Sequence, residues 1–126
     1  MLVFVYNADS GLFNILGDVA HKIISPRTYP CNLCAITYSI FGMRHEWEQF
    51  LRTLNMPYEF LHRDELKRRY DVEGVRLPAV FKKEGAGLAV WIDTSAINSC
   101  RNLDDLKQLI TNKLLFYNER PAYWMY

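Results

Sequence analysis

The sequence lacks several features that would assign it to a functional class at once. Its formal net charge is only +1 over 126 residues, so it has neither the basic surface typical of nucleic-acid-binding proteins nor an acidic tail. No apolar run approaches the ~20 residues that a membrane-spanning helix needs, and the N-terminal apolar run reaches Asp9 too soon for a secretory signal. We therefore expect a cytoplasmic protein that binds neither nucleic acid nor membranes.

The motifs of several large enzyme classes are also missing. The sequence contains no G-x-x-x-x-G-K-[ST] phosphate-binding loop, no Rossmann glycine pattern, no G-x-S-x-G nucleophile elbow and no H-E-x-x-H zinc motif. Enzymes that depend on those motifs therefore have no support in this sequence, and we expect no cofactor.

Cysteine is scarce, and its arrangement is the most informative feature of the chain. There are three cysteines, Cys31, Cys34 and Cys100, and an odd number fits a reducing compartment better than a secreted disulfide scaffold. Two of them stand in the segment Tyr29-Pro-Cys-Asn-Leu-Cys34. A C-x-x-C pair of this kind is a redox dithiol, half of a metal site, or two buried thiols without chemistry.

The metal-site alternative is incomplete in the sequence. A structural zinc site needs four ligands, which usually come from two C-x-x-C units or from one unit and two histidines. The chain has one such unit, a lone Cys100 and three histidines scattered singly. A closed site would therefore require the fold to bring a distant ligand such as His62 or Cys100 to the pair.

Hydrophobic patterning predicts a single domain over residues 1–126, because half of the residues are hydrophobic and the length suffices for a core. Short apolar runs predict strands, and helical periodicity predicts helices. The expected strands cover 2–6, 58–62, 79–83 and 88–93, and the expected helices cover about 10–25, 44–54, 64–70 and 103–114. Residues 35–43 suit a strand as well as a helix, and residues 117–126 form an aromatic C-terminal tail.

This order of elements resembles the thioredoxin-like superfamily, especially its glutaredoxin-like members. Two motifs carry the resemblance: Cys31-Asn-Leu-Cys34 matches C-x-x-C, and Leu77-Pro78-Ala-Val-Phe81 is similar to the segment that holds the superfamily's cis-proline. The resemblance implies an α/β fold with a four-stranded mixed sheet flanked by helices, and a cis peptide bond before Pro78. Here the patterning adds an extra helix between the first strand and the C-x-x-C.

The chain departs from the glutaredoxins in detail. Asn-Leu stands between the cysteines, and no Gly-Gly pair follows Asp93, so the resemblance does not imply glutathione as the substrate. The stretches Tyr6–Gly11 and Tyr29–Cys34 are also similar to a family of small bacterial proteins, which implies no particular activity.

The superfamily resemblance implies a thiol–disulfide oxidoreductase. Cys31 would attack a protein or small-molecule disulfide, and Cys34 would resolve the mixed disulfide. By the same resemblance, Tyr29, Leu77 and Pro78 would contact the substrate.

Topology supplies two supporting residues. If the third expected strand runs antiparallel to the other three, the ends of those three strands share one edge of the sheet with Pro78 and the cysteine pair. That carboxyl edge is where α/β sheets usually bind ligands. His62 and Arg63 would lie there, where each could stabilise a thiolate.

Two other hypotheses remain open at this point. The chain could be a non-enzymatic thioredoxin-fold binding module that docks through residues 117–126, because fold does not determine function. It could also bind a metal through the C-x-x-C. The sequence does not indicate an oligomeric state.

Overall fold

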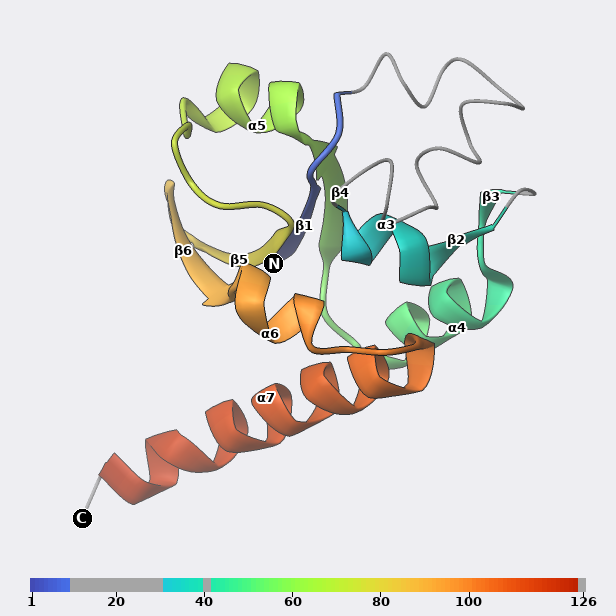
Figure 1. Ribbon diagram of the computed structural model, residues 1–126. Helices are drawn as coiled ribbons and strands as arrows, with labels where there is room; N and C mark the ends of the chain where they lie inside the picture. Colours follow the sequence, from blue (N-terminus) through green and yellow to red (C-terminus); the bar gives the residue numbers. More distant parts are fainter. Residues whose placement is uncertain (10–30, 40–41, 125–126) are drawn as a thin grey trace.

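A computed structural model describes residues 1–9, 31–39 and 42–124, and it has a four-stranded sheet with helices on both faces (Figure 1). The strand order is β4-β1-β5-β6. A separate two-stranded sheet pairs β2 with β3. The strands are β1 (Leu2–Tyr6), β2 (Tyr38–Ser39), β3 (Gly42–Met43), β4 (Tyr58–His62), β5 (Ala79–Glu84) and β6 (Gly87–Ile92).

The directions of the four main strands are those assumed from the sequence. β1 is parallel to β4, with Tyr6 opposite His62, and antiparallel to β5, with Val5 opposite Ala79. β5 and β6 form an antiparallel hairpin. The ends of β1, β4 and β6 therefore meet the start of β5 at one edge, which we call the carboxyl edge. The predicted bounds of all four strands are confirmed to within one residue.

Five helices are described, and none of them is both long enough and apolar enough to span a bilayer. They are α3 (Asn32–Thr37), α4 (His45–Thr53), α5 (Arg63–Tyr70), α6 (Thr94–Asn98) and α7 (Leu103–Trp124). In Figure 1, α5 lies near the top of the view and α7 crosses the bottom.

The core has two layers because the strands alternate their side chains between the faces. β1 is buried on both sides: Leu2, Phe4 and Tyr6 join one cluster, and Val3 and Val5 join the other. The first cluster packs against α3, α4, α6 and α7 and contains all three cysteines. The second cluster packs against α5.

Three sequence-based expectations need correction or completion. A short helix, α6, lies between β6 and α7, where we expected neither a helix nor a strand. Residues 35–43 contain both a helix end and the β2–β3 pair. α7 continues past Leu114 to Trp124, through much of the segment that we expected to be a tail. The helix expected over residues 10–25 lies outside the described residues.

Candidate redox site

The two cysteines of the C-x-x-C form a disulfide at the start of α3. Cys31 is the N-cap residue of the helix, and Cys34 lies in its first turn. Their Cα atoms are 5.3 Å apart, within the range that a disulfide spans. One helical turn thus brings the two sulfur atoms together, which is the geometric reason for the two-residue spacing.

The sulfur of Cys31 also caps the helix. Its Sγ accepts a hydrogen bond from the backbone N–H of Cys34, with a donor–acceptor distance of 3.3 Å. The first N–H groups of a helix have no partner within the helix, so an acceptor at the N-cap satisfies one of them. In the reduced protein the same N–H would stabilise a thiolate on Cys31.

Asn32, between the cysteines, fixes the position of α3. Its side-chain amide donates to the carbonyl oxygen of Ile97 at 2.7 Å and to that of Cys100 at 3.0 Å. These bonds tie the start of α3 to α6 and to the turn that follows. This role of Asn32 could not be predicted from the sequence, since nothing local to the C-x-x-C motif indicates a partner more than sixty residues away.

Both cysteines of the pair are completely buried. Cys31 and Cys34 each have 0% exposure and belong to the cluster that includes Tyr6 and Ile97. A buried disulfide is protected from solvent and from bulky reductants. Any exchange with a substrate disulfide therefore requires the sulfur of Cys31 to become accessible first.

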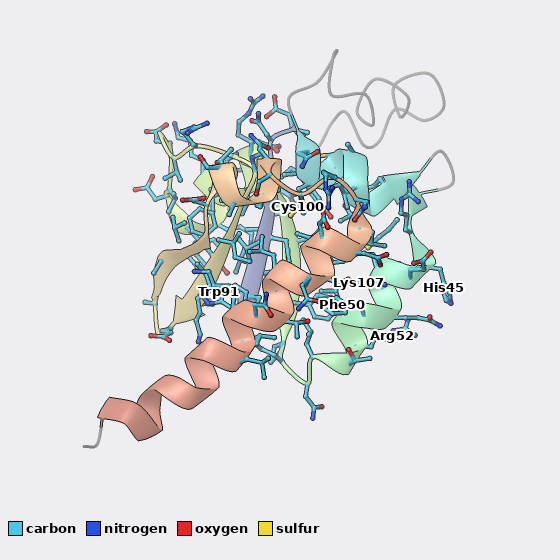
Figure 2. The ribbon with its side chains drawn as sticks, turned by 60° about the horizontal axis from the view of Figure 1, so that its bottom comes forward. His45, Phe50, Arg52, Trp91, Cys100 and Lys107 are labelled. Carbon is cyan, nitrogen blue, oxygen red and sulfur yellow. A yellow bond between two sulfur atoms is a disulfide. The ribbon has the colours of Figure 1, made fainter. Side chains whose placement is uncertain are left out.

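Cys100, labelled in Figure 2, is the free cysteine of the same cluster. Its S–H donates to the carbonyl oxygen of Ala96 at 3.6 Å. Burial, and to a smaller extent the carboxylate of Asp105, raise the pKa of the Cys100 thiol. Cys100 is therefore held as a protonated thiol, which is a poor nucleophile.

Pro78 lies at the carboxyl edge, directly before β5. The peptide bond between Leu77 and Pro78 is cis, which confirms the isomer implied by the resemblance. Pro78 is buried and Leu77 is half-buried. Tyr29, the third residue expected to contact substrate, lies outside the described residues.

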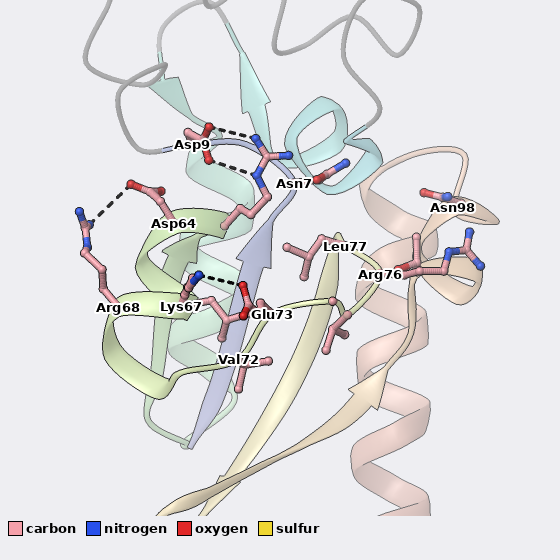
Figure 3. A pocket seen from close by; sticks show the side chains of 15 residues that line it. Asn7, Asp9, Asp64, Lys67, Arg68, Val72, Glu73, Arg76, Leu77 and Asn98 are labelled. Carbon is pink, nitrogen blue, oxygen red and sulfur yellow. Dashed lines mark hydrogen bonds and ion pairs between the residues drawn. The ribbon is translucent and has the colours of Figure 1, made fainter.

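A cavity of about 820 Å³ opens at the carboxyl edge, between α5, the 72–77 segment and α6 (Figure 3). Neither Cys31 nor Cys34 is among its described lining residues. Its charged side chains are largely paired, as Figure 3 shows. The pairs are Arg63–Asp9 with contacts of 3.0 and 3.1 Å, Lys67–Glu73 at 2.9 Å and Arg68–Asp64 at 3.6 Å.

His62 and Arg63 lie at the carboxyl edge, as expected, and both contact carboxylates. The His62 ring contacts Glu65 through Nδ1, and its backbone N–H donates to the same carboxylate at 3.0 Å. Burial acts to raise the pKa of Glu65, but the hydrogen bonds from His62 outweigh it and hold that pKa below its usual value. His62 and Glu65 thus form the capping box of α5, and Arg63 pairs with Asp9.

The metal alternative finds no further ligands in the part of the chain that the structure describes. There, no three histidine, cysteine or acidic side chains come close enough together to hold one ion. His62 is engaged with Glu65 at the start of α5, and Cys31 and Cys34 are bonded to each other.

Comparison with protein-family models, curated proteins and solved structures finds no match to this chain. Function is therefore inferred from the geometry of the site and from the arrangement of the strands.

Proposed function

We propose that the chain is a thioredoxin-like domain that catalyses thiol–disulfide exchange through Cys31 and Cys34. The order and directions of the four strands agree with the core topology of that superfamily. The C-x-x-C at the start of a helix and the cis-proline before β5 are the two motifs expected of it. These features support the fold assignment, while the reaction depends on the cysteine pair itself.

One observation carries the proposed chemistry: the N–H of Cys34 donates to the sulfur of Cys31. In the reduced protein this donor faces the Cys31 sulfur, and a thiolate accepts a hydrogen bond more strongly than a thiol does. The bond therefore favours the ionised form of Cys31 over that of Cys34, because among the described hydrogen bonds no donor faces the Cys34 sulfur. Cys31 is accordingly the nucleophile and Cys34 the resolving thiol.

The reaction follows the usual steps of disulfide exchange. The Cys31 thiolate attacks one sulfur of a substrate disulfide, a mixed disulfide forms, and the other substrate sulfur leaves as a thiolate that takes up a proton. The Cys34 thiol then loses its proton and attacks the Cys31 sulfur, which releases the second substrate thiol. The pair gives up two electrons and ends as the observed disulfide, and two external thiols, or one dithiol, must reduce it again and are themselves oxidised to a disulfide.

Leu77, Pro78 and Tyr29 are proposed to hold the substrate beside the pair. His62 and Arg63 are proposed to act more weakly, through the electrostatic field at the carboxyl edge. The Asp9 carboxylate already offsets much of the positive charge that Arg63 could direct at a thiolate, and the His62 ring already contacts the Glu65 carboxylate. The substrate would be a protein or small-molecule disulfide.

A second candidate is a binding module without catalytic activity, and the burial of both sulfur atoms favours it. In that case the disulfide would hold the start of α3 closed and never exchange with a substrate. The two candidates differ in whether the Cys31 thiolate forms near neutral pH and whether reagents reach it.

The deciding experiment is alkylation of each cysteine in reduced, chelator-treated protein as a function of pH, read by mass spectrometry. We expect Cys31 to react well below the pH at which an ordinary thiol, with a pKa of about 8.5, becomes reactive. Cys34 and Cys100 should react more slowly. The unfolded chain in denaturant serves as the control for full access.

Turnover completes the test. The wild type should reduce a small aromatic disulfide, and the Cys34→Ser variant should accumulate a mixed disulfide on Cys31. If Cys31 titrates like an ordinary thiol, or stays protected at every pH, the oxidoreductase proposal is wrong and the binding-module candidate replaces it.

A further inference from the structure

The outer edge of the main sheet is formed by β6, and this strand is apolar throughout. β6 is the last strand in the order and has only β5 beside it. Its sequence, Gly-Leu-Ala-Val-Trp-Ile, contains no charged residue and no proline. Ala89 and Val90 are exposed, and 50% of the surface of Val90 is accessible to solvent. Edge strands are usually protected by a charge, a proline or a covering segment, because a bare edge pairs readily with another strand.

The backbone of β6 is open on its outer side. In the part of the chain that the structure describes, backbone hydrogen bonds join β6 to β5 and to no other segment. The other edge strand, β4, carries Glu59 and His62, and the Glu59 carboxylate contacts Arg69 at 3.2 Å. The two edges of the sheet therefore differ, and only β6 offers an uncharged strand for pairing.

We propose that β6 pairs antiparallel with β6 of a second copy of this chain, so that two four-stranded sheets join into one of eight strands. The absence of charge along β6 is the argument for a second copy. Pairing a charged strand with itself would place like charges opposite each other, which is destabilising. A neutral strand meets its own copy without that penalty, and a twofold axis closes the assembly.

The side chains fix the register of this pairing. Leu88 belongs to the cluster on the α5 face, and Val90 lies opposite Phe81, which belongs to the same cluster. Trp91 packs against the cluster on the other face (Figure 2). A twofold axis perpendicular to the sheet keeps each face on its own side. Paired residues must therefore point to the same face.

An axis through Ala89 meets this condition. It pairs Leu88 of one copy with Val90 of the other on the α5 face of the sheet. On the other face it pairs Gly87 with Trp91. An axis through Val90 would oppose Leu88 to Ile92, whose side chains lie on different faces because the register shifts after Val80. The Ala89 register also lets an aromatic side chain cover the glycine across the strands.

Burial of exposed apolar surface supports the same arrangement. Val90 is one of the exposed large hydrophobic residues, and it lines a small cavity together with Val75 and Arg76. In the proposed register the Leu88 side chain of the other copy lies opposite Val90 on the same face of the sheet and covers it.

Sedimentation velocity over a range of protein concentrations tests the proposal. We expect the wild type to form a reversible dimer, and Ala89→Lys to raise its dissociation constant by roughly tenfold or more, because two lysines would oppose each other across the axis. Leu115→Lys is the matched control, since Leu115 is 56% exposed on α7 and should leave the dimer intact. Circular dichroism verifies that both variants are folded.

A cysteine cross-link tests the register in a Cys100→Ser background. Ala89→Cys should form an intermolecular disulfide readily, because residues on the axis face each other at about 4.5–5.5 Å between Cα atoms. Val90→Cys should not, because its copies are offset diagonally by about 7–8 Å. A wild type that stays monomeric, a dimer that survives Ala89→Lys, or cross-linking through Val90 in preference to Ala89 would each overturn the proposal.

Discussion

Cys31 and Cys100 are buried in the same core cluster, yet the backbone presents opposite groups to their sulfur atoms. Cys31 accepts a hydrogen bond from an N–H, whereas Cys100 donates one to a carbonyl oxygen. An N–H favours a negative sulfur and a carbonyl favours a protonated one. Burial alone therefore does not determine what a cysteine can do, because the direction of the nearest peptide group matters as much.

The same comparison explains why Asn32 matters. Its amide donates to the carbonyl of Cys100 and, one turn away, to that of Ile97. The segment that carries Cys100 thus holds the start of α3, where Cys31 and Cys34 form the disulfide. Hydrogen bonds from Asn32 therefore connect the segments that carry Cys31 and Cys100, although the proposed roles of these two cysteines differ.

The largest expected effect comes from exchanging the two sulfur atoms for oxygen in turn. Cys31→Ser should lower disulfide reductase turnover by about 100-fold or more, since hydroxyl oxygen cannot take part in disulfide exchange. Cys100→Ser should leave turnover within about twofold, because a protonated thiol contributes no nucleophile. Turnover with a small aromatic disulfide measures both. Equal losses in the two variants would contradict the division of roles.

An intermediate effect is expected from Asn32. Asn32→Ala should lower the free energy of unfolding by about 1–3 kcal/mol, because two partly buried carbonyl groups lose their donor. Urea titration measures this change.

Asn32→Asp has nearly the same shape but brings a carboxylate to both carbonyls and next to Cys31. It should destabilise the fold at least as much as Asn32→Ala and also move Cys31 alkylation to higher pH. Alkylation of Asn32→Ala is the control that separates charge from packing. If the alkylation of Cys31 has the same pH dependence in Asn32→Asp as in Asn32→Ala, local charge does not govern the reactivity of Cys31.

The parts of the molecule that sequence predicts well are those with local signals. β1 is a continuous apolar run, and a Glu-Gly-Ala-Gly turn separates β5 from β6, so both features could be placed from sequence. Leu77-Pro78 was expected to be cis from its motif, and the structure agrees. The C-x-x-C spacing likewise located the cysteine pair.

The parts that sequence analysis missed depend on short or distant interactions. α6 has only five residues, too few to show a repeating pattern of apolar positions. Its one local signal is the N-cap residue Asp93, whose carboxylate accepts a hydrogen bond from the N–H of Ala96 at 2.9 Å. The Asn32 contacts join residues 65 and 68 positions apart. The complete burial of the pair also arises from tertiary packing, so the pattern of local residues could not predict it.

The smallest expected effect concerns the pH dependence of Cys100. Burial, then Asp105, raise the pKa of this thiol, so its alkylation should begin at higher pH than that of an ordinary thiol. Asp105→Asn removes the smaller of the two causes and should move the alkylation profile of Cys100 modestly to lower pH, without reaching that of Cys31. Asp105 also contacts Arg101 at 3.0 Å, so Arg101→Gln is the matched control for loss of that ion pair. A Cys100 profile that coincides with that of Cys31 in the wild type would show that the direction of the nearest peptide group does not set thiol reactivity in this core.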